Sequence, residues 1–301
     1  MKKFVHIGAD PEFFYINKGE FDEFPINYSI PPVVFRKKKL LTPIRVFNRR
    51  HYVFWEEGNY VLHEDGAAFE LTTPPFNNII EMRESVLAII NEAQKDLGIE
   101  FTIIPAAKFI IPEKYVNDKE FIKACEFGCN PDIEGYMPEI NLTTHTISAE
   151  DIPFRFGGGH IMIEFPEELK ELMMNYHDIF SQFLAITVGL RMIAFTKFPE
   201  LIKERAKYYG TPCKYRDNKL HKGLFEYRTP SNEWLLFNEQ QLLEIENGIN
   251  IALTLFHARD ELARNFLKNY IDNVAKIIYK ADVNSAKKLV DKIRKEEEKI
   301  K

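Results

Sequence analysis

Four short segments of the chain alternate apolar and polar residues, as half-buried β-strands do. Side chains at positions i and i+2 of a strand point to the same face, so each segment presents one apolar and one polar face. The polar faces carry Asp10 and Glu12, Glu70, His160 and Glu164, and Glu226 and Arg228. Because carboxylate, imidazole or guanidinium groups recur in all four segments, we expect the strands to line one polar funnel above an apolar core.

Hydrophobic periodicity predicts both strands and helices. Apolar residues recur every three or four positions in the helical segments. The expected strands are 4–16, 67–72, 100–105, 161–165 and 224–229, and the expected helices are 78–97, 167–195 and the chain from 238 onward. Strands and helices are interspersed without regular βαβ alternation, which favours an α+β fold with an antiparallel or mixed sheet flanked by helices. The charged tail 287–301 is expected to be a helix with a solvated face.

Composition narrows the class of protein. The net charge is −5, and no basic face is evident before the C-terminus, so nucleic acid is a disfavoured partner. The most apolar segment, 180–195, is interrupted by Gln182 and Arg191 and is short for a membrane span, so we expect a buried helix and no membrane association. The N-terminus reaches acidic residues before any long apolar stretch, unlike a signal peptide.

Cysteine usage fits a reducing compartment. The three cysteines, Cys125, Cys129 and Cys213, are an odd number and suggest no disulfide framework. Cys125 and Cys129 lack a second Cys or His pair at zinc-finger spacing, so structural zinc is disfavoured. A cytoplasmic location is therefore expected.

The polar face suits hard cations and phosphate. Carboxylate oxygens bind Mg²⁺ or Mn²⁺, and a histidine can complete the set. Mg²⁺ bridges nucleotide phosphates, and an arginine such as Arg228 can hold a phosphate with two donors. Three glycines, 157–159, precede His160 and would let the backbone approach a phosphate closely.

Each of these features has a structural alternative. Asp10-Pro11-Glu12 also fits the start of a helix. Glu226 and Arg228 also fit a salt-bridged pair within a sheet, and the glycine triplet fits an ordinary turn. A lone histidine is more often structural than a ligand, and the chain has neither a Walker P-loop nor a GxGxxG fingerprint.

Five ordered motifs lie between residues 4 and 235: 7–14 (IGADPEFF), 65–71 (DGAAFEL), 127–132 (FGCNPD), 158–161 (GGHI) and 226–232 (EYRTPSN). Together they resemble the carboxylate–amine ligases encoded by phages related to coliphage phiEco32, a branch of the glutamine synthetase and glutamate–cysteine ligase superfamily. Arg205, Tyr209-Gly210 and Arg216 fit the run that precedes the last motif. The resemblance implies a glutamine-synthetase-like catalytic domain over residues 1–265. Residues 266–301 would form a helical extension packed on this domain or trailing it.

The resemblance also implies a reaction: ATP phosphorylates a carboxylate, and an amine attacks the acyl phosphate. It implies ATP and Mg²⁺ (or Mn²⁺) as cofactors, and a small-molecule or peptide carboxylate and an amine as substrates, in the host cytoplasm if a phage encodes the chain. The implied metal ligands are Asp10, Glu12, Glu70, His160 and Glu226. Arg228 is implied to stabilise the transferring phosphoryl group, with Arg216 and Arg205 as weaker candidates. Gly158, Gly159, His160 and Arg205 are implied nucleotide contacts, Asp65 the receiver of the incoming ammonium, and Cys129 part of a structural loop.

One departure from the family pattern leaves rival functions open. The family usually carries a second histidine where this chain has Met162, and a glycine where it has Glu164. Thioether sulfur does not bind Mg²⁺, so either Glu164 supplies the missing contact or the site is altered. The alternatives are an inactive homologue with a binding or structural role in the phage, and a Mg²⁺-dependent hydrolase, which would need no ATP.

Overall fold

An antiparallel sheet organises the fold in the computed structural model, which describes residues 4–37, 44–46, 49–51, 53–126, 133–136, 151–217 and 223–300. Its strands run in the order β10-β13-β14-β12-β1-β7-β6-β5, with β2 and β8 also paired to β1. The strands are β1 (Ile7–Ile16), β2 (Ser29–Ile30), β5 (Val53–Glu57), β6 (Tyr60–Asp65), β7 (Ala68–Thr72), β8 (Phe101–Thr102), β10 (Ile133–Glu134), β12 (Gly159–Glu164), β13 (Lys214–Asp217) and β14 (Leu224–Tyr227). The predicted α+β class and antiparallel sheet are therefore confirmed.

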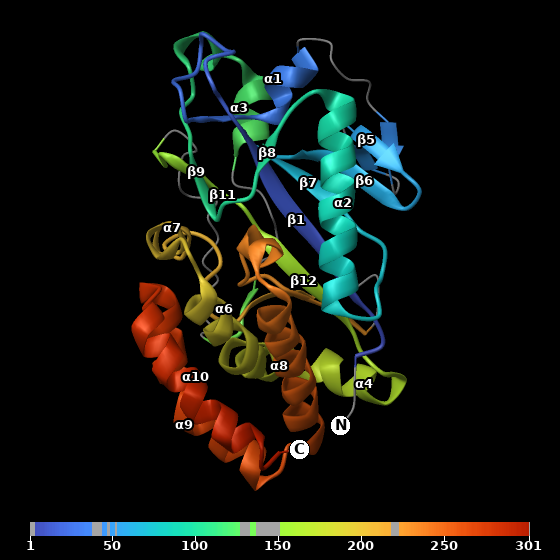
Figure 1. The fold of residues 1–301 in the computed structure, drawn as a ribbon, viewed down its shortest axis with the longest axis vertical. Helices are drawn as coiled ribbons and strands as arrows, with labels where there is room; N and C mark the ends of the chain where they lie inside the picture. The colour runs from blue at the N-terminus through green and yellow to red at the C-terminus, as the bar shows by residue number, and fades with distance from the viewer. Residues whose placement is uncertain are drawn as a thin grey trace.

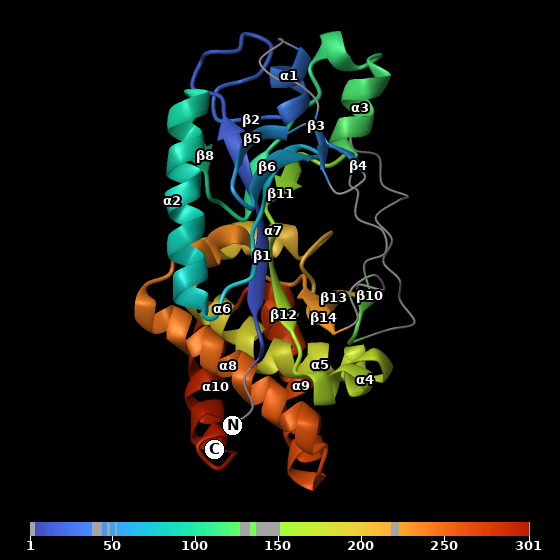
Figure 2. The same ribbon diagram turned by 90° about the vertical axis from the view of Figure 1, so that its right-hand side faces the viewer.

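Strand β1 lies at the centre of the sheet and changes partner along its length (Figures 1 and 2). Its first half pairs with β12, and Glu12 and Phe13 then pair with β7. The segment Asp10-Pro11-Glu12 therefore lies within a strand and does not start a helix. In this register Asp10 lies opposite His160 and Glu12 lies opposite Glu70, so their side chains share one face.

The opposite face of the sheet is apolar and packs on helices. Helix α2 (Ile79–Leu97) contacts β1, and α5 (His177–Leu184) contacts β14. Helix α8 (Glu239–Ala258) packs on α5 and α2. Phe180 of α5 meets Phe225 of β14 with ring centroids 5.0 Å apart. As predicted, α2 ends at Gly98, and the Asn78 side chain caps its start by accepting a hydrogen bond from the Glu81 N–H.

The long apolar helix expected over 167–195 is divided. Helix α4 (Glu167–Asn175) ends at Tyr176, whose ψ of 41° departs from helical geometry. Helix α5, the π-helical turn η3 (Ala185–Gly189) and α6 (Leu190–Phe195) then follow. His177–Phe195 is long and apolar enough to cross a membrane, but 78% of its most apolar window is buried inside the protein, where it packs as a core helix.

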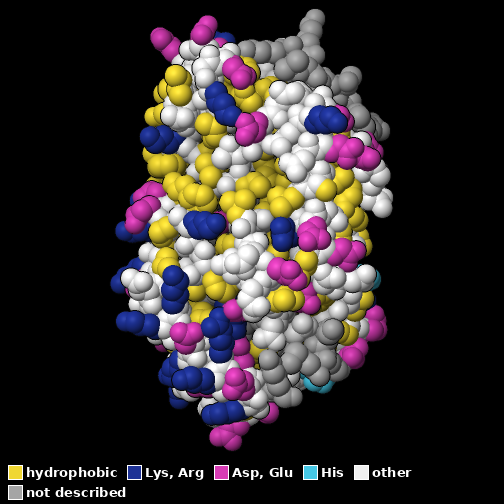
Figure 3. Space-filling view, viewed as in Figure 1, with side chains coloured by type: hydrophobic (Ala, Val, Ile, Leu, Met, Phe, Trp, Pro, Cys, Tyr) yellow, Lys and Arg dark blue, Asp and Glu magenta, His cyan; other side chains and the backbone are white. Residues whose placement is uncertain are grey.

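The C-terminal helices belong to the same core as the sheet. Helices α9 (Glu261–Lys280) and α10 (Val283–Glu297) follow α8, and α10 packs on α6. The expected boundary between residues 265 and 266 falls inside α9, whose buried Phe266 and Tyr270 lie in the main hydrophobic cluster. In Figure 3, lysine and arginine side chains gather at the lower left, where α9 and α10 lie in Figure 1.

Several short elements were not predicted from the sequence. They are α1 (Pro32–Lys37), β3 (Ile44–Val46), β4 (Arg49–His51), β9 (Ala106–Lys108), α3 (Lys119–Cys125), β11 (Phe154–Phe156), α7 (Pro199–Arg205), and the 3₁₀ turns η1 (Glu113–Tyr115) and η4 (Asn232–Leu236). Strand β8 covers only two residues of the predicted 100–105 strand.

A buried ion pair ties the C-terminal helix to the core. Arg191 Nη2 in α6 donates to Glu297 Oε2 in α10 at 2.6 Å, and both side chains are buried. Replacing Glu297 by Ala removes this partner from a buried guanidinium, and we expect the free energy of unfolding to fall by about 3–5 kcal/mol. Urea denaturation measures this loss. The adjacent Glu298→Ala change, at an exposed position, should alter stability by less than about 0.5 kcal/mol; equal losses in both variants would contradict the assignment.

Candidate metal centre

Two groups of potential metal ligands lie on the polar face of the sheet. One consists of Asp10, His160 and Glu226, and the other of Glu12, Asp65 and Glu70. Within each group, one ligand atom from every residue lies within 4.8 Å of the others. The six residues come from β1, β6, β7, β12 and β14, so strand pairing brings together groups that are far apart in the sequence.

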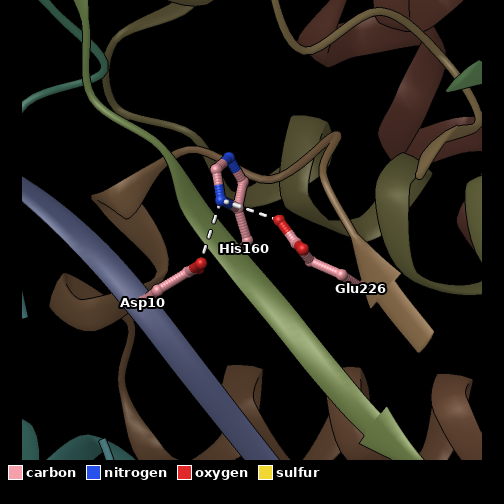
Figure 4. Close-up of side chains that lie close together, drawn as sticks. All are labelled: Asp10, His160 and Glu226. Atoms are coloured by element: carbon pink, nitrogen blue, oxygen red, sulfur yellow. Dashed lines mark ion pairs between the residues drawn. The ribbon is translucent and has the colours of Figure 1, made fainter. Parts of the chain in front are cut away.

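The first group is deeply buried around the imidazole of His160 (Figure 4). His160 Nδ1 lies 3.1 Å from Asp10 Oδ1 and 3.5 Å from Glu226 Oε1. Neither Nδ1 nor Asp10 Oδ1 has a hydrogen-bond partner among the described residues, although both atoms are buried. Buried polar atoms normally have partners, and these two converging atoms could hold a cation.

Two arginines flank the carboxylate of Glu226. Arg228 donates from Nη1 to Glu226 Oε1, and Arg216 Nη1 lies 3.3 Å from Glu226 Oε2. Arg228 also donates from Nη2 to the hydroxyl of Tyr209, and that hydroxyl lies 2.8 Å from His160 Nε2. The predicted phosphate-binding Arg228 therefore adjoins the first ligand group, with Arg216 beside it.

The second group is less buried and has a histidine neighbour. His63 Nε2 lies 3.5 Å from Glu70 Oε1 and 3.1 Å from the Thr72 hydroxyl. Asp65, implied as a receiver for ammonium, lies with Glu12 and Glu70. Sequence reasoning missed His63 because β6 was not recognised, although His63 and Asp65 have the i, i+2 spacing of one strand face.

The buried carboxylates hold protons more tightly than usual. Burial raises the pKa of Asp10 to about 7 against the opposing effect of Arg228 and Arg216. Burial, with the charge of Asp65, raises the pKa of Glu12 to about 8. Burial and the Arg228 charge lower the pKa of His160 well below its usual value, so its ring is neutral at pH 7. A neutral imidazole is the form that ligates metals.

These residues fit a divalent cation such as Mg²⁺ or Mn²⁺. Both groups offer carboxylate oxygens, the ligands that hard cations prefer, and the first adds an imidazole nitrogen. A cation with ligands at about 2.0–2.6 Å brings its ligand atoms within about 5 Å of one another, close to the spacing found here. A positive ion would also relieve the repulsion among the buried carboxylates.

The glycine triplet packs tightly against the site. Its three N–H groups donate to Pro105 O, Glu12 Oε2 and Pro230 O, respectively. A Cβ at Gly158 would lie 2.6 Å from His160 Nε2, and one at Gly159 would lie 2.3 Å from Ser231 O. Close packing is therefore a sufficient reason for glycine at 158 and 159. The expected phosphate contacts of these residues are not supported, since their N–H groups are engaged within the protein.

Arg205 supports the segment that directly follows Glu226 and Arg228. Its Nη1 donates to Thr229 O at 2.6 Å, and its Nη2 donates to Pro230 O at 2.9 Å. The guanidinium is buried beneath the segment that follows β14. This arrangement favours a scaffolding role over the nucleotide contact implied by the family resemblance.

Glu164 lies outside both ligand groups. Its Oε2 is 2.7 Å from His6 Nδ1, and its side chain is 38% exposed. Met162 is in register with Glu226 and so shares the polar face. The placement gives no support to Glu164 as a replacement ligand for the family's second histidine.

Cys129 and the 127–132 motif lie outside the described residues. Cys125 and Cys213 are buried and form no disulfide with each other. No family model matches the chain, and no curated protein matches it.

The raised pKa values predict how the cation-free protein responds to pH. The folded chain retains the proton on Asp10 up to about pH 7 and the proton on Glu12 up to about pH 8. The unfolded chain loses both protons at about pH 4. Their stabilising contribution is full below that lower pH and is lost as pH rises through the folded values. In EDTA, the urea midpoint of the wild type should therefore fall with rising pH relative to that of Asp10→Asn. A relative rise would contradict the assignment.

Proposed function

We propose that the chain is an ATP- and Mg²⁺-dependent carboxylate–amine ligase with a glutamine-synthetase-like fold. The main support is the convergence of two carboxylate groups with Arg228 and Arg216 on one face of an antiparallel sheet. Hard-cation ligands beside arginines suit the transfer of a phosphoryl group, whose charge both can neutralise. The five sequence motifs add the family resemblance.

The first step would join the substrate carboxylate to phosphate. A carboxylate oxygen attacks the γ-phosphorus of ATP, the bond from that phosphorus to the β,γ-bridging oxygen breaks, and ADP leaves with the bond's electrons. Bound Mg²⁺ would supply positive charge to the phosphate oxygens. Asp10, His160 and Glu226 would hold one cation, and Glu12, Asp65 and Glu70 a second. Arg228, buried and oriented by Glu226 and Tyr209, would donate to the transferring phosphoryl group.

The second step would form the amide. The amine nitrogen attacks the acyl carbon, the carbon–oxygen bond to phosphate breaks, and inorganic phosphate leaves. The nitrogen must lose a proton to a base as the amide forms. Asp65, on the less buried side of the ligand groups, is suited to receive the ammonium form of the amine or its proton.

Met162 motivates a second candidate, a homologue that binds nucleotide and cation without turnover. Met162 lies in register with Glu226, and Glu164 pairs with His6 outside both ligand groups. The site would then have fewer ligands than the family pattern supplies. This candidate would be favoured if the protein bound ATP but released no ADP with any pair of carboxylate and amine substrates.

The ligase proposal predicts a trappable acyl phosphate. With ATP, Mg²⁺ and a panel of amino acids and short peptides as carboxylates, hydroxylamine should replace the amine and yield a hydroxamate together with ADP. The hydroxamate reports the activated carboxylate directly, and omission of Mg²⁺ is the control. AMP and pyrophosphate would show adenylation, and ADP formation without any carboxylate would show hydrolysis of ATP itself; either result would sink the proposal.

The carboxylates of both groups should be needed for turnover. Glu12→Gln, Glu70→Gln and Glu226→Gln keep the side-chain shape but remove the charge that holds a cation, so we expect Mg²⁺-dependent ADP release to fall by at least about 100-fold in each. Glu164→Gln is the matched comparison, because its carboxylate lies on the same face but pairs with His6. It should retain activity within a few-fold of wild type.

Circular dichroism checks the fold of each variant. Near wild-type activity in all three ligand variants would refute the two-group site. A large loss in Glu164→Gln alone would return that residue to the ligand set.

A further inference from the structure

The hydroxyl of Tyr209 joins the imidazole and the guanidinium of the site. Its oxygen lies 2.8 Å from His160 Nε2 and accepts a hydrogen bond from Arg228 Nη2. The Tyr209 ring lies against two guanidinium groups, with Arg205 Cζ 4.9 Å and Arg228 Cζ 5.5 Å from its centroid. Cation–π contacts of this kind hold the ring in place. The phenol is therefore a fixed neighbour of His160.

The donor and acceptor roles follow from the chemistry of the groups. A guanidinium only donates, so the phenol oxygen accepts from Arg228. A neutral imidazole carries one proton, and a nitrogen that binds a metal must present its lone pair. If Nδ1 binds a cation with Asp10 and Glu226, Nε2 must carry the proton and donate it to Tyr209. The opposite tautomer would place a proton between Nδ1 and the carboxylates, where the cation would lie.

We propose that Tyr209 is a positioning residue whose hydroxyl oxygen accepts a hydrogen bond from the Nε2–H of His160 and so holds the Nδ1 lone pair toward a divalent cation shared with Asp10 and Glu226. The inference rests on the proposed function for the cation alone, since neither ATP nor ligase activity enters it. Two observations support it: Nδ1 and Asp10 Oδ1 are buried without hydrogen-bond partners among the described residues, and Nε2 faces the phenol. Outer partners of this kind orient metal-binding histidines.

The local packing leaves the phenol close to the ring nitrogen. A Cβ at Gly158 would lie 2.6 Å from His160 Nε2, so the main chain packs directly against that nitrogen. Behind Tyr209, Gly210 has a φ of +70°, and a Cβ there would lie 1.6 Å from Arg205 Nη1. Without the Tyr209 oxygen, a proton on buried Nε2 would lose this partner, which disfavours the cation-binding tautomer.

Cation binding tests the proposal without any enzyme assay. Binding of Mn²⁺ is measured by calorimetric titration and checked by displacement with Mg²⁺. At the first ligand group, Tyr209→Phe should bind Mn²⁺ about 10–100-fold more weakly than wild type does. Tyr208→Phe is the matched control: it removes the same hydroxyl one residue away, where the ring stacks on Phe156. It should bind as wild type does. Glu70→Gln, which impairs the second group, isolates the first in each background.

Nitrogen NMR provides a readout that a purely structural role would not change. In wild type labelled with ¹⁵N-histidine and saturated with diamagnetic Mg²⁺, His160 should show a protonated Nε2 and an unprotonated Nδ1, with His160→Gln identifying its signals. This measurement holds even if Tyr209→Phe fails to fold.

The outcomes separate this inference from the proposed function. Wild type that binds neither cation would overturn both. Cation binding with equal affinity in wild type and Tyr209→Phe, equal losses in Tyr208→Phe and Tyr209→Phe, or a proton on Nδ1 in the Mg²⁺-loaded protein would overturn the role of Tyr209 and leave the cation site standing.

Discussion

The antiparallel register of β1 with its two neighbours determines where the buried charges of this protein lie. Pairing Asp10 with His160 and Glu12 with Glu70 places all four side chains on one face, while the alternate residues Ala9 and Phe13 face the helices. A slip of one residue would turn the carboxylates into the apolar core, where an unpaired charge is costly. The register that makes the core apolar is therefore the register that assembles the polar site.

Charge within that face is balanced only in part. Glu226 has two arginines beside it. For Asp10 and Glu12, burial is the largest cause of the raised pKa values. Stability alone does not favour such an arrangement, since apolar side chains of similar volume would pack there without desolvating charge. Perturbed carboxylates next to unpartnered polar atoms are typical of a functional site. A bound cation would give both the carboxylates and the buried Nδ1 of His160 a partner.

Local patterns predicted the parts of this molecule that depend on local chemistry. Asn78 and Gly98 mark the ends of α2 because a cap needs a side-chain acceptor at one end and a left-handed residue at the other. The i, i+2 spacing also predicted that Asp10 and Glu12 share one face of their strand. Non-local packing was not predictable in the same way. The bend at Tyr176 and the role of Arg205, which acts on carbonyl groups more than twenty residues away, have no signature in nearby sequence.

The same glycines fit two different roles. A glycine triplet before a histidine fits a phosphate-binding loop, but glycine is also needed where other groups pack so closely on the main chain that a Cβ would not fit. Here Gly158 N–H binds Glu12, and the missing Cβ leaves room for His160 Nε2. Gly158 therefore acts on the carboxylate and imidazole that would hold the cation. Met162, on β12, also lies on the face of the sheet that carries the ligands, but it offers no ligand atom for a hard cation. The group of described residues that could hold a cation at this position is Asp10, His160 and Glu226, so the orientation of one imidazole ring would bear directly on cation binding.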